Sequence, residues 1–166
     1  MAGEKHKFLD DSHMSYEEVF GFTVQYPARL LVALADRLGK EQFLETLKEV
    51  TLDDARKSGA EEASKTGKHD MATFHNAYLV NPNEFWKHTV TLEIVENTEK
   101  AVEVKVSECL WAKAFRAVGA QEIGYAMWCH YDFGNCQGFN PKMHLVRTKT
   151  LMQGDDCCNH RWVLEE

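Results

Sequence analysis

The sequence predicts an α+β domain, with helices packed on one face of a roughly four-stranded antiparallel sheet. Three observations support this fold class. The first half of the chain repeats apolar residues at helical spacing, two later stretches alternate apolar and polar residues as strands do, and no strand–helix–strand alternation links them. The order is helices, hairpin, helices, hairpin. We expect a single domain over residues 1–166, with flexible residues 1–14, a helical part at 15–80 and a hairpin–helices–hairpin part at 86–164.

Several helix boundaries can be assigned in the first part. Ser15 opens a Ser-x-x-Glu capping box, which predicts a helix start. Pro27 fits the first turn of a following helix, because its missing N–H would have no partner there, and Gly39 is expected to end that helix. Residues 41–65 predict a longer helix, and Asp70 can cap a third, short one.

Two β-hairpins are predicted in the second part. Residues 86–95 and 102–107 alternate apolar and polar side chains on either side of a polar turn. Residues 143–152 and 157–164 form the second pair of predicted strands, joined by a turn at 153–156. Both hairpins would belong to one antiparallel sheet.

The stretch between the hairpins returns to helical spacing. Residues 108–118 and 120–132 predict two helices, and Gly134 and Gly138 are expected to end the second. Cys109 then stands at the start of the first helix. A helix N-terminus lowers the pKa of a thiol, which would make Cys109 reactive; simple packing is the alternative.

The composition is that of an ordinary soluble globular protein, with 44% hydrophobic and 27% charged residues in 166. The net charge of −7 argues against a nucleic-acid partner, which would require clustered Lys and Arg. No run of about 18 apolar residues predicts a membrane helix, and the N-terminus lacks the apolar core of a secretory leader. We therefore expect a cytoplasmic protein with reduced thiols and no membrane partner.

All five cysteines lie in the last third of the chain, together with histidines and aspartates. Their odd number and the adjacent pair Cys157 and Cys158 argue against a disulfide framework. A concentration of thiols, imidazoles and carboxylates suggests a functional site. The alternative is that the cysteines pack the core, because free cysteine is among the most buried residue types.

Cys129, His130 and Asp132 form the first candidate catalytic group. On a helix Cys129 and Asp132 are three residues apart and share a face, whereas His130 points elsewhere unless the helix has unwound. Cys129 could serve as nucleophile or metal ligand, and Asp132 as base or second ligand, with His130 as another proton carrier. The alternative is a buried thiol beside a carboxylate that caps the backbone.

A second group of candidates lies in the predicted C-terminal hairpin. On a strand Cys157 and Cys158 would point to opposite faces, and His160 would share the face of Cys158. Arg147 and Thr148, also on opposite faces, are the candidate substrate-binding residues. Arg147 could hold a substrate carboxylate through two N–H groups, and a surface arginine is its alternative.

A divalent metal, zinc or iron, is the cofactor that this residue set would hold. The candidate ligands are Cys109, Cys129, Asp132, Cys158 and His160. The paired CxxC or HxxxH spacing typical of zinc sites does not occur, so such a metal would be assembled from three separate segments. The residues leave open a thiolate nucleophile or a metal-activated water.

In chain order, the motifs of the last third are Cys109, Cys129-x-x-Asp132, Arg147-Thr148 and Gly154-Asp155-x-x-Cys158. This succession resembles the L-2-amino-thiazoline-4-carboxylic acid hydrolase family. The resemblance implies opening of a cyclic amidine, with water added at the C=N carbon of a thiazoline ring to give N-carbamoyl-L-cysteine. The closing Gly-Asp-x-x-Cys string is also similar to that of 4-vinyl reductase small-molecule-binding domains, which implies a TRAPP-like fold.

We therefore expect a small-molecule hydrolase acting on a C–N bond of a cyclic amidine or thiazoline-type carboxylate. The alternative is a non-catalytic small-molecule- or metal-binding sensor domain of the 4-vinyl reductase type. A third interpretation is that the cysteines only pack the core. The expected partner is a small-molecule ligand or substrate, and a homodimer is the oligomer to consider, since sheet edges and helix faces of such domains commonly associate.

Overall fold

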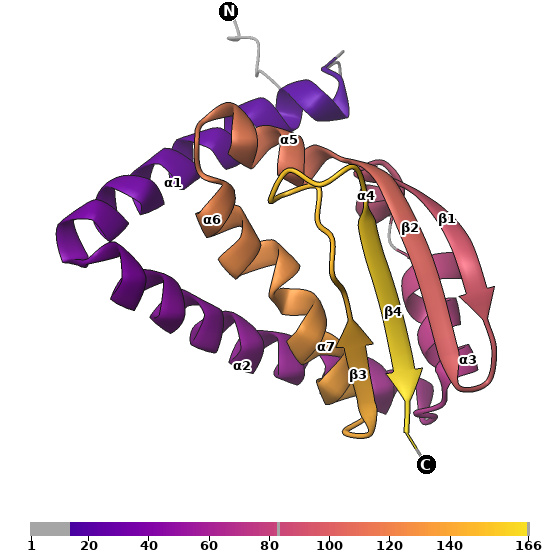
Figure 1. Ribbon diagram of the computed structural model, residues 1–166. Coiled ribbons are helices and arrows are strands. Elements are labelled where there is room, and N and C mark those ends of the chain that lie inside the picture. Colours follow the sequence, from indigo (N-terminus) through magenta and orange to yellow (C-terminus); the bar gives the residue numbers. More distant parts are fainter. Residues whose placement is uncertain (1–13, 83, 166) are drawn as a thin grey trace, which may run out of the picture.

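Two long helices and a four-stranded sheet dominate the computed structural model, which describes residues 14–82 and 84–165 (Figure 1). The flexibility expected of residues 1–13 lies outside the described residues. The helical elements are α1 (Tyr16–Leu38), α2 (Lys40–Thr66), α3 (Met71–His75), α4 (Glu84–Lys87), α5 (Leu110–Ala117), α6 (Gln121–Gly124), α7 (Tyr131–Phe139) and the π-helical segments η1 (Asn76–Val80) and η2 (Tyr125–Cys129). The strands are β1 (Val90–Asn97), β2 (Ala101–Cys109), β3 (Met143–Val146) and β4 (Cys158–Leu164).

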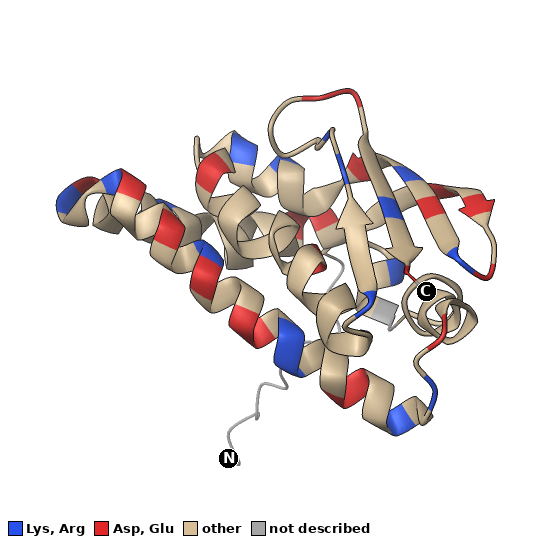
Figure 2. Cartoon of the chain, turned by 60° about the horizontal axis from the view of Figure 1, so that its bottom comes forward, with Lys and Arg blue, Asp and Glu red and all other residues tan. Residues whose placement is uncertain are grey.

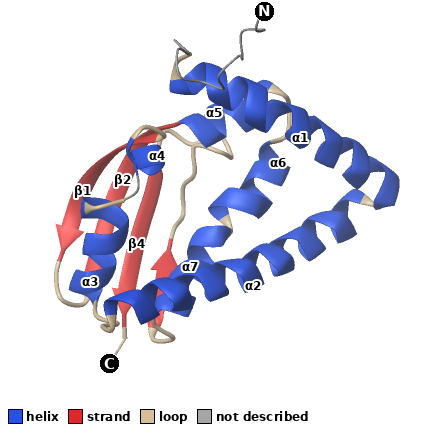
Figure 3. Ribbon diagram, turned by 180° about the vertical axis from the view of Figure 1, so that it is seen from behind, coloured by secondary structure: helices blue, strands red, loops and turns tan. Residues whose placement is uncertain are grey.

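The sheet is antiparallel, with strand order β1-β2-β4-β3. Its outer face and the outward side of α2 carry acidic and basic residues (Figure 2), whereas α3, α4 and α7 lie over the other face (Figure 3). This is the α+β architecture that the sequence predicts. Among the described residues, no helix combines the length and the apolar character needed to span a membrane.

Helix α1 begins at the predicted cap. The Oγ of Ser15 accepts a hydrogen bond from the Glu18 backbone N–H at 3.3 Å, and the Glu18 carboxylate accepts one from the Ser15 N–H at 2.8 Å. The prediction that Pro27 starts a second helix is wrong, because α1 continues through it to Leu38. A proline inside a helix costs about 3 kcal/mol, which packing offsets here, since one face stays buried on both sides of it (Phe20, Val24, Ala28 and Ala35).

Helix α7 contains both glycines that were expected to end it, so that prediction is also wrong. A Cβ added at Gly134 or Gly138 would overlap the backbone of α2, in the second case at Arg56. Gly59 of α2 makes the reciprocal contact, since its Cβ would overlap the Asn135 carbonyl group of α7. The glycines therefore allow two helices to approach backbone to backbone, which offsets the roughly 1 kcal/mol that each glycine costs in a helix.

The first predicted hairpin is present, and it sets the two faces of the sheet. Strands β1 and β2 pair with Ile94 opposite Val104, and β2 pairs with β4 with Val104 opposite His160. Alternation along β4 places Cys158, His160 and Trp162 on one face, as predicted for the first two, and this face lies toward the helices.

The second hairpin differs from the prediction, because β3 ends at Val146 rather than at residue 152. The following backbone N–H groups bond to side chains instead of a strand. Thr148 and Lys149 donate to the Asn159 Oδ1 at 3.0 and 2.7 Å, and Thr150 donates to the Asp155 carboxylate at 2.7 Å. The connection between β3 and β4 is therefore a long, internally bonded loop.

Candidate functional site

The candidate site centres on Arg147, the residue that follows β3. Its Nη1 donates to the Asp132 Oδ2 at 2.8 Å, and its Nη2 donates to the Cys129 carbonyl oxygen at 2.8 Å. The guanidinium also lies over the rings of Phe133 and Tyr125, with its central carbon 4.8 and 5.6 Å from the ring centroids. Only 1% of the Arg147 side chain is exposed, so this cation is held inside the protein.

Asp132 and His160 complete a group that we call the Arg147 cluster (Asp132, Arg147 and His160). The His160 Nε2 lies 3.3 Å from the Asp132 Oδ2 and 3.1 Å from the Arg147 Nη1. Asp132 stands in the first turn of α7, and a third of its side chain is exposed. This exposed edge is the part of the cluster that solvent or a small molecule can reach.

His160 has one ring nitrogen that makes no hydrogen bond within the described part of the chain. The ring is stacked on Trp162, with centroids 5.5 Å apart, and its Nδ1 is buried and unpartnered. If Nε2 accepts the Arg147 hydrogen bond, the proton sits on Nδ1; if Nε2 carries the proton toward Asp132, Nδ1 is a free acceptor. In either tautomer, the buried Nδ1 of His160 has no hydrogen-bond partner among the described residues, and the buried Nδ1 of His130 shares this property.

The charge of Arg147 persists despite its burial. Burial alone would lower the pKa of Arg147, but the neighbouring Asp132 carboxylate, with Tyr125 and Cys129, raises it above its ordinary value. The guanidinium therefore remains a fixed cation beside the Asp132 carboxylate.

The thiols around the cluster are held in their protonated form. Burial, followed by the negative charge of Asp132, raises the pKa of Cys129, and burial raises the pKa of Cys158 to about 11. The prediction of a lowered thiol pKa at Cys109 is wrong. Cys109 does cap α5, accepting a hydrogen bond from the Ala112 N–H at 3.5 Å, but burial outweighs that bond and raises its pKa.

His130, a predicted catalytic residue, lies beside the cluster on the side that faces α2. The charges that act on its ring after burial are those of Lys48, which lowers its pKa, then of Arg147, and of Glu45, which raises it. Two of these, Lys48 and Glu45, belong to α2. The His130 ring also lies beside the rings of Phe133 and Tyr125, with centroids 5.5 and 6.1 Å away, and it makes no hydrogen bond with Asp132 or His160 in the described part of the chain.

The other predicted residues lie outside the cluster. Thr148 is exposed, and its Oγ1 accepts a hydrogen bond from the Asn159 side chain at 2.9 Å, so it does not share a pocket with Arg147. Cys157 precedes β4, and its Sγ lies 3.7 Å from the Asp156 carboxylate. Cys136 is buried in α7 and donates to the Phe133 carbonyl oxygen at 3.3 Å.

The predicted metal ligands do not fit a metal site. Within residues 14–82 and 84–165, no group of three or more His, Cys, Asp or Glu side chains is placed to hold a metal ion. The Asp132 carboxylate is instead paired with Arg147, and the Cys158 Sγ accepts the Leu151 N–H at 3.2 Å.

Sequence reasoning missed Tyr125 and Phe133, whose rings enclose Arg147. Tyr125, Cys129 and Phe133 recur every four residues, which on a helix places them on one side. That spacing, together with the position of His160 on the same face as Cys158, was the sequence pattern that could have indicated these residues. The proximity of Arg147 to this side depends on tertiary packing, which no local pattern contains.

Comparison with protein families places most of the chain in one family. The family model described as L-2-amino-thiazoline-4-carboxylic acid hydrolase matches residues 22–162. The chain belongs to this family, as its motifs suggested. No curated protein gives a match.

Two solved structures share the fold at low sequence identity. A trafficking protein particle complex subunit 3 from Naegleria fowleri, covalently bound to palmitic acid, is 12% identical with a TM-score of 0.52, over 90% of this chain and 97% of that one. The phenol-responsive sensory domain of the transcription activator PoxR, with phenol, is 11% identical with a TM-score of 0.50, over 91% of this chain and 75% of that one. These likenesses confirm the predicted TRAPP-like fold.

Proposed function

We propose that this protein hydrolyses a cyclic amidine that carries a carboxylate, of the L-2-amino-thiazoline-4-carboxylate type, at the Arg147 cluster. The observation that carries this proposal is the partly accessible Asp132–His160 contact, held by a buried arginine inside the range that matches the family. A carboxylate and an imidazole in contact are suited to moving the protons of a hydrolysis.

The reaction requires water to add at the C=N carbon of the ring. In the proposed step His160 accepts a proton from the water, whose oxygen bonds to that carbon, and passes this proton to the ring nitrogen as the C=N bond becomes single. The carbon–sulfur bond then breaks as the new hydroxyl becomes a carbonyl, and the hydroxyl proton ends on the released sulfur, because a thiolate is a better leaving group than an amide nitrogen. The bond that breaks is thus carbon–sulfur rather than the expected C–N bond, and the product is N-carbamoyl-L-cysteine.

Asp132 and Arg147 act as positioning residues in this proposal. Both terminal nitrogens of Arg147 already bond within the protein, so a substrate carboxylate would have to compete with Asp132 for them. Arg147 is therefore better suited to fixing Asp132 than to the predicted role of substrate clamp. Asp132 in turn orients the His160 ring.

The state of Cys129 favours water over a thiolate as the nucleophile. A thiol with a raised pKa is almost fully protonated at neutral pH, and a protonated thiol is a poor nucleophile. The proposal therefore expects the Cys129→Ser variant to keep most of its activity, in contrast to variants of Asp132 and His160.

The test is to incubate the purified protein with L-2-amino-thiazoline-4-carboxylate and follow two signals. These are the mass gain of one water and the release of one free thiol per turnover. Asp132→Asn and His160→Gln should each lower kcat by about 100-fold or more, and His130→Gln, the matched histidine control, should change it less than a few-fold. No product with wild type, or equal losses in the His130 and His160 variants, would reject the proposal.

A non-catalytic ligand-binding domain is the second candidate. It is supported by the shared fold of the PoxR sensory domain, which holds phenol, and by the protonated state of the thiols. Calorimetric titration with phenol and with the thiazoline, followed by recovery of the ligand, separates the two candidates. Saturable binding with the ligand recovered unchanged after prolonged incubation supports the sensor.

A further inference from the structure

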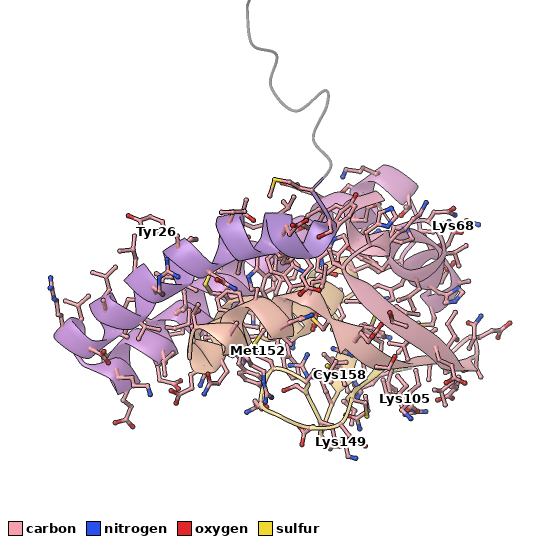
Figure 4. The ribbon with its side chains drawn as sticks, turned by 90° about the horizontal axis from the view of Figure 1, so that it is seen from above. Tyr26, Lys68, Lys105, Lys149, Met152 and Cys158 are labelled. Carbon is pink, nitrogen blue, oxygen red and sulfur yellow. The ribbon has the colours of Figure 1, made fainter. Side chains whose placement is uncertain are left out.

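The outward side of α1 carries a continuous apolar stripe. Its members recur every three or four residues along the helix, and all are exposed: Val19, Phe22, Tyr26, Leu30, Leu34 and Leu38. The most exposed are Phe22 at 74% and Leu38 at 67%. In Figure 4, Tyr26 points away from the rest of the protein.

The opposite side of α1 is also apolar and packs into the core, against α5 and α6. A helix that is apolar on both sides is normally buried on both sides. Helix α2 provides the contrast within the same protein, because its outward side is lined with charged residues (Figure 2). The apolar stripe therefore has the character of an interface rather than of a solvated face.

We propose that the α1 stripe is the interface for a second copy of this chain, with the two α1 helices antiparallel across a two-fold axis. The sequence of the stripe is self-complementary in that arrangement. Residues four apart advance by about 40° around an α-helix, so the stripe is an inclined ridge, and two such ridges pack with their helix axes crossed. Tyr26 would face the partner's Leu30 beside the two-fold axis, with Phe22 and the partner's Leu34 next to them. Each aromatic ring is thus opposite a leucine, as an isologous interface requires.

Two further features suit this arrangement. The six exposed side chains and their edges offer on the order of 700 Å² per chain, close to the roughly 800 Å² that each partner buries in a standard interface. Arg37, which forms no ion pair among the described residues, would lie level with the partner's Glu18. The antiparallel order also opposes the two helix dipoles.

A membrane surface is the competing occupant, and the charge of the chain argues against it. Helices that lie on membranes carry Lys and Arg along their polar edges. The edges of this stripe mix acidic and basic residues, and the chain has a net charge of −7. We therefore assign the stripe to a protein partner of the same sequence.

The first test is sedimentation equilibrium of the full chain, with wild type beside Phe22→Glu. Wild type should be dimeric, and the glutamate should raise the dimer Kd at least about 100-fold, because it buries an unpaired charge at the centre of the stripe. Val95→Glu is the matched control, since Val95 is also exposed, at 57%, but lies on β1. Circular dichroism verifies that each variant is folded. A monomeric wild type, or a dimer unaffected by Phe22→Glu, overturns the proposal.

The second test distinguishes helix directions with a short bismaleimide cross-linker. A mixture of Phe22→Cys and Leu34→Cys chains should cross-link to each other far more than either does to itself. Self-cross-linking of Phe22→Cys alone would indicate parallel helices and reject the proposed axis. Co-sedimentation of a monomeric wild type with anionic lipid vesicles would reject it in favour of a membrane.

Discussion

The same kind of ion pair occurs on each face of the sheet, in different surroundings. On the inner face, Arg147 bonds to Asp132 at 2.8 Å with 1% of its side chain exposed. On the outer face, Arg161 bonds to Glu96 at the same 2.8 Å with 40% exposed. Equal distances do not imply equal energies, because the two carboxylates are similarly exposed (33% for Asp132 and 30% for Glu96) whereas only the inner arginine is shielded from water. The inner pair can therefore hold Asp132 in place beside His160, whereas the outer pair contributes little to stability.

The largest effect should come from breaking the inner pair. Asp132→Asn leaves Arg147 charged and buried without its counter-ion, which should lower the free energy of unfolding by about 3–5 kcal/mol, measured by urea denaturation. Replacing both partners, with Asp132→Leu and Arg147→Met, should recover most of that stability but no turnover. If Asp132→Asn were as stable as wild type, the charge of Arg147 would not depend on Asp132 for its stabilisation, and the prediction would be wrong.

The next effect is a loss of stability at high pH, caused by the Cys158 thiol on the inner face of the sheet. Cys158 keeps its proton in the folded protein up to a pKa of about 11, against an ordinary value of 9.0. Unfolding therefore releases a proton between these values, so its contribution to stability is complete below pH 9 and is lost as pH rises to about 11. Urea titrations at pH 8, 9.5 and 11 measure this, and Cys158→Ala should flatten the decline. An unchanged slope in that variant would contradict the prediction.

Rates of thiol labelling at two positions of β4 should also differ between the inner and the outer face of the sheet. Cys158 faces inward, whereas Val163 lies at an outward-facing position of β4. At pH 8, a Val163→Cys thiol should react with a chromogenic disulfide about 100-fold faster than Cys158, because burial suppresses both access and ionisation. Mass spectrometry of partly labelled protein assigns the sites, and comparable rates would show that the inner face opens readily.

The smallest effect belongs to the outer pair. Glu96→Gln should lower the free energy of unfolding by less than about 1 kcal/mol, and the loss should shrink as salt is added. Measuring the same denaturation curves at low and high ionic strength tests this. A loss as large as that of Asp132→Asn would mean that exposure does not separate the two faces.

The sequence predicted features that depend on neighbouring residues. The capping box at Ser15, the first hairpin and the shared face of Cys158 and His160 all follow from the spacing of residues that are close together in the sequence. Features that depend on packing between elements far apart in the sequence were predicted wrongly. Helix α1 continues through Pro27, and Gly134 and Gly138 lie within α7 at its contact with α2 instead of ending the helix. The site shows the same division, since Asp132 and His160 were both candidates, but nothing local indicated that they share Arg147.

The glycine contact between α2 and α7 also has a consequence for the order of events during synthesis. The Arg56–Gln137 hydrogen bond across it joins residues 81 positions apart. At roughly 5–20 residues per second, a ribosome needs about 4 to 16 s to make that interval. During this time the buried face of α2, which includes Ala55, Gly59 and Ala63, has no docking partner on the nascent chain. Arg147 and His160 are made later still. The Arg147 cluster can therefore assemble only after both long helices have been synthesised.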